Sequence, residues 1–393
     1  MTNVHDPLRS LQRKCWFKLI CGASFQHLPA VRSLALAYGL AGSDCVDVAA
    51  DPAVVAAVRS AQAAIASLAP EAHQRGFRPQ VPWLMISLND GDDPHFRKAV
   101  FDPALCPPDC PRPCEAVCPA EAIVPESGVL SERCYGCGRC LPVCPPGQIS
   151  AQSYRVSPEA VAPLVMSGID AVEIHTQVGH YDRFRSLWQR AIAPQLRPLK
   201  LVAVSCPDGE GVIEYLRSLH ALMTPLPCAL VWQVDGRPMS GDLGKGTTHA
   251  TLRLAQKLAA ARLPGYIQLA GGTNRHTVPA LRRLQYRDQS GLLQQSGAIA
   301  AEARLPVAGI AYGSYARTQL MPTLEQLEAV SSGSASVLEA HPDLLWQAVA
   351  VAHSLVFQVK GASKALAVSI EPPFLEGYSV QVSSQRGCAA VVD

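Results

Sequence analysis

The sequence has little charge of either sign and no long apolar run. Charged residues make up 17% of its 393 residues, and 34 basic side chains nearly balance 32 acidic ones. A net charge of +2 offers no basic surface of the kind that binds nucleic acid. No stretch approaches the ~20 apolar residues that span a membrane, and the polar segment Met1 to Lys14 lacks the apolar core of a signal peptide. We therefore expect a cytoplasmic protein that is not an integral membrane protein and binds no nucleic acid.

The sequence also lacks a dinucleotide-binding turn. The first apolar strand is followed by Cys21-Gly22-Ala23-Ser24, which is not the G-x-G-x-x-G fingerprint. This argues against an open, doubly wound sheet, the main alternative for a chain in which strands and helices alternate. With 48% apolar residues, the chain is long enough for one large barrel or two to three ordinary domains.

What the chain does contain is a dense block of cysteines. Cys134-x2-Cys137-x2-Cys140-x3-Cys144-Pro145 is the run of bacterial ferredoxins, in which the fourth cysteine binds the other of two clusters. A related half precedes it, ending in Cys118-Pro119, and Ile123 and Ile149 stand at the same offset after the two Cys-Pro pairs. The spacing therefore predicts two iron–sulfur clusters.

The earlier half is irregular, because its cysteines are separated by three residues at every step. We assign the regular [4Fe–4S] cluster to Cys118, Cys134, Cys137 and Cys140. The irregular site, which could hold [4Fe–4S] or [3Fe–4S], takes Cys106, Cys110, Cys114 and Cys144. The alternative to iron–sulfur clusters is a structural zinc site or a set of disulfides formed by the same cysteines. Radical-SAM enzymes use the spacing C-x3-C-x2-C. Cys110-x3-Cys114-x3-Cys118 differs from it by one residue, which argues against that class of enzyme.

Eight short apolar segments, rich in Val, Ile and Leu, alternate with helical stretches. They are 17–23, 44–50, 83–88, 171–176, 199–206, 229–235, 266–270 and 307–313. This alternation predicts an α/β fold, a (β/α)8 TIM-like barrel with a ferredoxin-like insertion after the third strand. The expected parts are 1–90 (strands one to three), 91–156 (the iron–sulfur insertion), 157–360 (the rest of the barrel) and 361–393 (a tail). Because loops after barrel strands lie at the C-terminal face, the clusters should sit over the mouth of the barrel.

Several predicted strands carry one polar residue among apolar neighbours. These residues are Lys18, Asp47, Glu173, His175, Gln233 and Gln268. They could form a structural network in which Lys18 pairs with Asp47 or Glu173, or they could surround a ligand. Gly271 and Gly272 after the seventh strand and Gly313 after the eighth could bind a phosphate, or could be ordinary turn residues.

Several motifs resemble a known family along nearly the whole chain. They are Trp16-Phe-Lys-Leu-Ile-Cys-Gly-Ala-Ser24, Gln26-His-Leu-Pro29, Asp47-Val-Ala-Ala-Asp51-Pro52, His95-Phe-Arg-Lys98 and Cys134-Tyr-Gly-Cys-Gly-Arg-Cys140. The chain is similar to the light-dependent period family of cyanobacteria, LdpA. The resemblance implies an iron–sulfur protein that tunes the circadian period to light through cellular redox state, with clock proteins such as KaiA and sensor kinases as partners. It carries no catalytic motif over to the lumen residues.

The sequence leaves three functions open. The first is a redox sensor whose clusters exchange electrons with ferredoxin or the quinone pool. The second is a barrel oxidoreductase in which the clusters feed a flavin or another small molecule. The third is a cluster-bearing subunit of a larger complex. Fold alone cannot choose among them.

Overall fold

The computed structural model describes residues 6–124, 126–154, 163, 168–236, 247–292, 305–330 and 337–361. Its centre is a closed barrel of eight parallel strands in the order β1-β12-β11-β10-β9-β8-β3-β2. The strands are β1 (Trp16–Gly22), β2 (Cys45–Ala49), β3 (Trp83–Asn89), β8 (Ala171–His175), β9 (Leu201–Pro207), β10 (Ala229–Asp235), β11 (Tyr266–Ala270) and β12 (Val307–Tyr312). All eight predicted strands are present, and the predicted barrel is confirmed.

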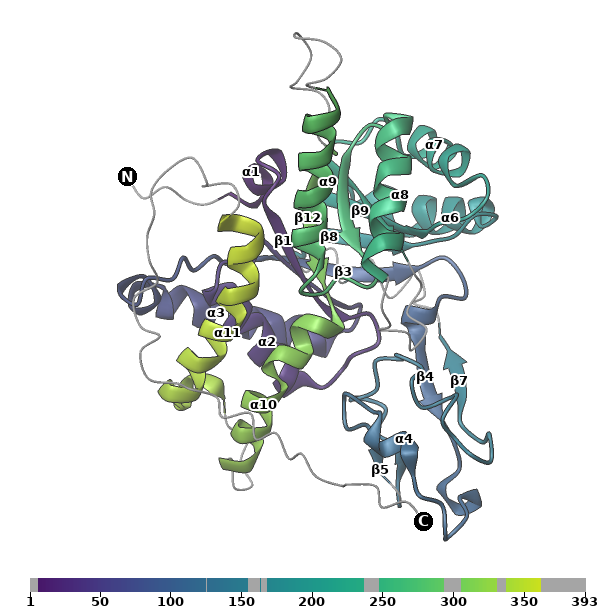
Figure 1. Cartoon of the computed structure of the whole chain (residues 1–393), viewed down its shortest axis with the longest axis vertical. Coiled ribbons are helices and arrows are strands. Elements are labelled where there is room, and N and C mark those ends of the chain that lie inside the picture. The colour runs from purple at the N-terminus through teal and green to yellow at the C-terminus, as the bar shows by residue number, and fades with distance from the viewer. Residues whose placement is uncertain are drawn as a thin grey trace, which may run out of the picture.

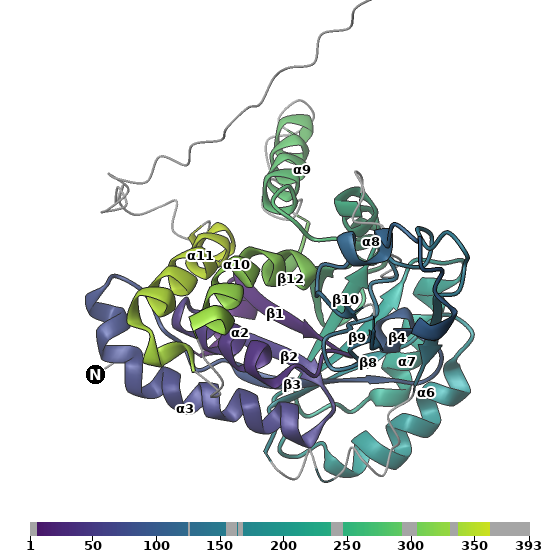
Figure 2. The same cartoon turned by 90° about the horizontal axis from the view of Figure 1, so that it is seen from below.

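Helices surround the barrel (Figures 1 and 2). They are α2 (Leu28–Leu40), α3 (Pro52–Gln74), α6 (Tyr181–Leu187), α7 (Val212–Met223), α8 (Thr247–Ala261), α9 (Thr277–Leu292), α10 (Ser314–Val330) and α11 (Pro342–Lys360). The start of α3 follows the expected rule, since the Asp51 carboxylate accepts hydrogen bonds from the backbone of Ala53 and Val54, and Pro52 occupies the first turn. The sequence predicts a last helix over His341–Lys360 that closes the barrel, and α11 confirms it within one residue.

One helix, α3, is long and apolar enough to cross a membrane by length and composition alone. The expectation that no segment reaches this length is therefore wrong on that criterion. Many of its apolar residues are alanines, which give a high mean hydropathy without large side chains. Six of its residues, including Val54, Val58 and Ile65, are buried against the rest of the protein. A helix that covers a soluble core meets the same criterion.

A short helix that the sequence pattern missed, α1 (Pro7–Gln12), closes the N-terminal end of the barrel. Its Leu11 is fully buried in a cluster with the inward-facing Trp16, Cys45 and Met85. Ser10 anchors the helix by donating a hydrogen bond of 2.7 Å to Asp44. The lumen is thus packed at this end, as barrel interiors are, and the C-terminal end faces the insertion.

The insertion lies between β3 and β8, as predicted, and projects from the barrel in Figure 1. It begins with a 3-10 turn, η1 (Pro94–Phe96), and contains β4 (Arg97–Val100), η2 (Pro103–Leu105), α4 (Pro113–Ala116), β5 (Ile123–Val124), β6 (Gly128–Val129) and β7 (Ser150–Ser153). Strands β4 and β7 pair antiparallel over four residue pairs, from Arg97 with Ser153 to Val100 with Ser150. The chain therefore enters and leaves the insertion through one two-stranded stalk.

The sequence also predicts a helix that starts at Ser157-Pro158-Glu159 and ends at Gly168, a loop at 331–336, a short strand at Tyr378–Val382 and a buried Cys388. These features lie largely or wholly outside the described residues.

Candidate functional site: the cysteine insertion and the barrel mouth

The eight predicted ligand cysteines all lie in the insertion, and five of them belong to one small apolar cluster or pack against it. Cys114, Cys134 and Cys140 are buried there, together with Ile123 and Ile149. These are the two isoleucines that follow the Cys-Pro pairs, so the pseudo-repeat in the sequence corresponds to two side chains that share one core. The 13 cysteines in the described part of the chain are free thiols.

The thiols of the regular run lie close enough to influence one another. The pKa of the Cys140 thiol is raised to about 12, first by burial and then by the charges of Cys137, Cys134 and Cys118. Burial also raises the pKa of Cys137, and Cys118 and Cys134 add to that rise. Thiolates held this close repel one another, and bound iron offsets that repulsion. The donor set therefore fits an iron–sulfur cluster.

The other four cysteines form a second group. Desolvation raises the pKa of Cys106, and its neighbours Cys110 and Cys144 add to the rise. The pKa of Cys114 is raised by burial and, among its neighbours, by Cys144. Cys144 is the last cysteine of the regular run in sequence but interacts with the irregular thiols in space, which is the exchange expected of two ferredoxin-type halves.

Two backbone amides donate hydrogen bonds to sulfur atoms of the regular group. Ala99 N lies 3.4 Å from Cys134 Sγ, and Ala122 N lies 3.3 Å from Cys118 Sγ. Such hydrogen bonds stabilise the electron-rich form of a cluster and tune its reduction potential. Ala99 belongs to β4, so the stalk also orients the regular group.

Tyr135 and Arg317 join this thiol group to the barrel. Tyr135 stands between Cys134 and Cys137, and its ring centroid lies 4.0 Å from the guanidinium carbon of Arg317 on α10. The same guanidinium donates hydrogen bonds to the carbonyls of Ile20 (3.0 Å) and Cys21 (2.7 Å) in β1. Arg317 is 5% exposed, so its interaction with nearby charges is poorly screened.

Gly136, next to Tyr135, is a position where only glycine fits. Its φ is +71°, and a Cβ there would lie 2.1 Å from the carbonyl oxygen of Arg97. Gly136→Ala should therefore displace β4 from the cysteine run and lower stability by about 1–3 kcal/mol beyond the backbone strain itself. The thermal midpoint and the iron retained per chain after anaerobic reconstitution measure the effect.

Gly147 provides the matched control for that substitution. Its φ is +67°, but a Cβ added there would have no atom within 4 Å. Gly147→Ala should cost only the backbone strain of about 1–2 kcal/mol and should keep its iron. Equal losses in the two variants would show that the contact between Gly136 and β4 is unimportant.

Polar residues of the lumen form one connected network. Lys18 contacts both Glu173 and Asp47, the latter at 3.3 Å. Ser87 donates to Asp47 (2.7 Å), Gln233 donates to Glu173 (2.5 Å), and Gln268 donates to Gln233 (2.6 Å). The structural interpretation of these residues is thus the one the contacts support, with Lys18 paired to both carboxylates.

The two carboxylates of this network have opposite pKa shifts. Burial would raise the pKa of Glu173, but its contact with Lys18 outweighs burial and holds it at about 2. Asp47 lies farther from the ammonium group, so burial dominates and raises its pKa to about 6. Lys18 itself remains charged, because the two carboxylates outweigh the effect of burial and raise its pKa.

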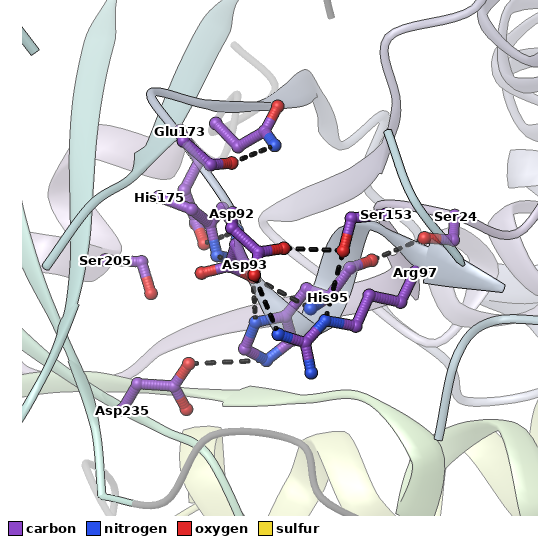
Figure 3. Close-up of polar contacts among 12 residues, drawn as sticks. Ser24, Asp92, Asp93, His95, Arg97, Ser153, Glu173, His175, Ser205 and Asp235 are labelled. Atoms are coloured by element: carbon purple, nitrogen blue, oxygen red, sulfur yellow. Dashed lines mark hydrogen bonds and ion pairs between the residues drawn. The ribbon is translucent and has the colours of Figure 1, made fainter. Parts of the chain in front are cut away.

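His175 extends this network to the mouth of the barrel, where it meets residues that sequence reasoning missed. Its Nε2 lies 3.0 Å from Glu173 Oε1, and its Nδ1 faces Asp93 at 3.8 Å. His95, from η1, contacts Asp93 through Nδ1 (2.8 Å) and Asp235 through Nε2 (3.4 Å). Figure 3 shows Asp93, His95, His175 and Asp235 gathered at this point. In the sequence, these missed residues were indicated only by Asp93-Pro-His95, which follows a few residues after the third strand.

The charges at the mouth are strongly coupled. Burial would lower the pKa of His95, but the carboxylates of Asp235 and Asp93 outweigh it and raise the pKa to about 9. Burial would raise the pKa of Asp93, yet His95 lowers it. For Asp235 burial dominates and raises the pKa. Perturbed groups of this kind gather at functional sites as well as in structural ion pairs.

The glycines after the last strands are in contact with side chains. A Cβ on Gly271 would lie 1.8 Å from Asp235 Oδ1, and one on Gly272 would lie 2.3 Å from Thr247 Cβ. The carboxylate of Asp235 beside Gly271 would repel a phosphate. These contacts favour the turn interpretation for the two glycines. The cysteines outside the insertion are buried (Cys15, Cys21, Cys45, Cys206) or half-buried (Cys228), as expected of small apolar residues.

Comparison with known proteins agrees with this geometry. The family model of the LdpA Fe–S cluster-binding domain matches residues 106–155, and that of the light dependent period A C-terminal domain matches residues 164–358. A relative named "Light dependent period A", from Synechococcus elongatus, is 51% identical over 370 residues, which cover 94% of this chain and 97% of the relative. The match at the cysteine block favours iron–sulfur over zinc. The chain therefore belongs to the light-dependent period A family and carries that family's iron–sulfur-binding domain.

Proposed function

We propose that this protein is a cytoplasmic redox sensor that relays light-dependent changes in cellular redox state to the circadian clock. Two clusters are proposed, a [4Fe–4S] held by Cys118, Cys134, Cys137 and Cys140, and a second held by the remaining four cysteines of the insertion. Bound clusters of this kind exchange single electrons with ferredoxin or a quinone pool. A reducing compartment keeps such thiols available.

The contact between Tyr135 and Arg317 carries the proposal. Arg317 lies over the ring of a residue flanked by two ligand cysteines, and it also holds the end of β1 through two carbonyls. A change in the charge at Cys134 and Cys137 changes the electrostatic potential at this buried cation. Arg317 thus couples the oxidation state of the insertion to the position of α10 and β1, and a partner that contacts this part of the barrel senses the difference.

The test compares partner binding in the two oxidation states. Following the family resemblance, purified KaiA is titrated under anaerobic conditions against oxidised and dithionite-reduced protein, and sensor kinases are titrated in the same way. We expect the two affinities to differ by about 5- to 150-fold, the usual range of coupling between two sites. Equal affinities for every partner tested would remove the switch.

Two variants locate the coupling. Arg317→Met should reduce the ratio of the two affinities toward one while the iron content stays unchanged. Arg97→Met removes a surface cation of the stalk that pairs with Asp92 at 3.2 Å, and it should leave the ratio as it is. If the ratio persists in Arg317→Met, the signal does not pass through this contact.

The rival function, a flavin- or small-molecule-binding oxidoreductase fed by the clusters, stays a prediction. The contacts of Gly271 and Gly272 with side chains give it no support. A flavin absorbance band in protein purified without air would favour it.

A further inference from the structure

Two histidines and a carboxylate converge at the barrel mouth in the arrangement of a metal site. One ligand atom each from Asp93, His95 and His175 lies within 4.8 Å of the other two. For both histidines the atom that faces Asp93 is Nδ1, at 2.8 Å for His95 and 3.8 Å for His175. A divalent ion needs donor atoms of these kinds, drawn about 2.0–2.2 Å around it. Small rotations of these three side chains achieve that.

The second nitrogen of each imidazole is held by a deeper carboxylate. His175 Nε2 lies 3.0 Å from Glu173 Oε1, and His95 Nε2 lies 3.4 Å from Asp235 Oδ2. Ligand histidines in proteins nearly always donate their other N–H to such a partner, which fixes the tautomer and leaves the first nitrogen free to bind metal. That both histidines follow this rule, with Nδ1 on the same side, is not required of a structural ion pair.

The charge around the cluster also favours a cation. Asp93 and Asp235 at the mouth, with Asp47 and Glu173 just below, are four carboxylates, and Lys18 is the lysine that pairs with the lower two. Asp235 is 3% exposed, and its Oδ1 has no hydrogen-bond partner among the described residues. His95 and His175, whose pKa values are raised, can add two positive charges to that of Lys18, and the four carboxylates still exceed these three cations by one. Buried carboxylates in excess of cations are costly unless positive charge compensates them.

We propose that Asp93, His95 and His175 bind a divalent first-row transition-metal ion, with Glu173 and Asp235 orienting the two histidines. A set of two histidines and one carboxylate is typical of Fe²⁺ and also binds Mn²⁺ and Zn²⁺. The side chains of Asp93 and His95 are 17% and 19% exposed, so the ion keeps coordination positions for water or a small ligand. This site is separate from the two thiol groups and does not depend on the proposed redox function.

The position of the site gives the ion a mechanical role. Asp93 and His95 belong to the first turn of the insertion, whereas His175 belongs to barrel strand β8. An ion bound by all three joins the base of the insertion to the barrel. Metal binding should therefore stabilise the native chain by mass action, and the thermal midpoint should rise with ion concentration.

The test uses Mn²⁺ with the full-length, cluster-replete protein. Mn²⁺ prefers oxygen and nitrogen donors, so thiolates compete weakly for it. The six-line electron paramagnetic resonance signal of free Mn²⁺ disappears on binding, and we expect a single tight site per chain together with a raised thermal midpoint. Asp93→Asn should weaken binding at least 10-fold, while its amide oxygen can still accept the backbone hydrogen bond from His95 that the carboxylate accepts now (2.8 Å). Asp235→Asn should weaken binding 10- to 100-fold through loss of the outer partner.

His180→Gln is the matched control. His180 is a nearby histidine of similar burial, held by Asp90 at 2.9 Å, and it is not part of the cluster. This variant should bind Mn²⁺ as the unmodified chain does. The proposal is overturned if the unmodified chain binds no Mn²⁺, or if Asp93→Asn binds it as tightly as His180→Gln does. If the redox test gave equal partner affinities, the proposed redox switch would be wrong, but the metal-site proposal would be unaffected. The two proposals can therefore be tested independently.

Discussion

Lys18→Met should lower the free energy of unfolding by about 3–5 kcal/mol, because it leaves two carboxylates in the centre of the barrel without their cation. Lys18 and Glu173 are completely buried, and Asp47 is 1% exposed. The removed ammonium group contacts both carboxylates. Because this part of the lumen is closed to solvent, bulk water does not solvate the carboxylates in its place. Chemical denaturation followed by circular dichroism measures the loss.

Two comparisons show that the loss comes from buried charge. Lys257→Met removes a surface lysine that lies 3.0 Å from Asp208, and it should change stability by less than about 1 kcal/mol. Adding Glu173→Gln to Lys18→Met removes one of the uncompensated charges and should recover part of the loss. A double variant as unstable as the single one would mean that packing of the lysine stem, rather than charge, dominates.

Acid should also rescue the Lys18→Met variant in part. Burial already raises the pKa of Asp47 to about 6, and loss of Lys18 should raise it further. The pKa of Glu173 should rise as well, because, of its two charged partners, only His175 then remains to oppose burial. The destabilising effect of the two carboxylates is then greatest at neutral pH and is relieved as the pH falls below the raised pKa. In the unmodified chain the pKa of Glu173 is about 2, below its ordinary value, so the stability it contributes is present above pH 4.5 and is lost as the pH falls toward 2.

Cys140→Ser should remove one whole cluster. Cys140 interacts with Cys137, Cys134 and Cys118, and a [4Fe–4S] cluster needs all four thiolates. Iron and sulfide in anaerobically purified protein should each fall by about four per chain. The half-buried Cys228, which lies outside the insertion, provides the control, because Cys228→Ser should keep full iron content.

The same experiment tests how the cysteines are divided. Cys118→Ser should produce the same spectrum as Cys140→Ser, since the two thiols belong to one group. Cys144→Ser should instead affect the cluster of Cys106, Cys110 and Cys114. If Cys118→Ser and Cys144→Ser alter the same spectroscopic feature, the proposed exchange between the two halves is wrong.

The barrel could be predicted because its parallel strands are buried on both faces, by helices outside and by lumen residues inside. Such strands appear in the sequence as short apolar segments. Single polar residues within those runs, such as Lys18 and Gln233, marked the lumen correctly. Helix α1, which closes the N-terminal end of the barrel, was missed. It has only six residues, and two leucines are too few to show a helical periodicity of apolar residues. The ligand cysteines were readable because their spacing is set by cluster geometry rather than by the fold.

The cluster at the mouth could not be predicted in the same way. His95 and Asp93 lie in a turn outside the strand pattern, and His175 is 80 residues farther along the chain. Only closure of the barrel between β3 and β8 brings these residues together. Nor did Asp235 stand out, since a polar residue at the end of an apolar strand is common.

The β4–β7 stalk and the contact of Tyr135 with Arg317 both tie the insertion to the barrel on the side of the regular thiol group. The regular thiol group is the one tied to the barrel, through Ala99 and Tyr135. The irregular group lies beside Leu105, a large apolar side chain that is 62% exposed. If the proposed redox function holds, an electron carrier would reach the irregular group first, and the regular group would be the one whose charge acts on the barrel.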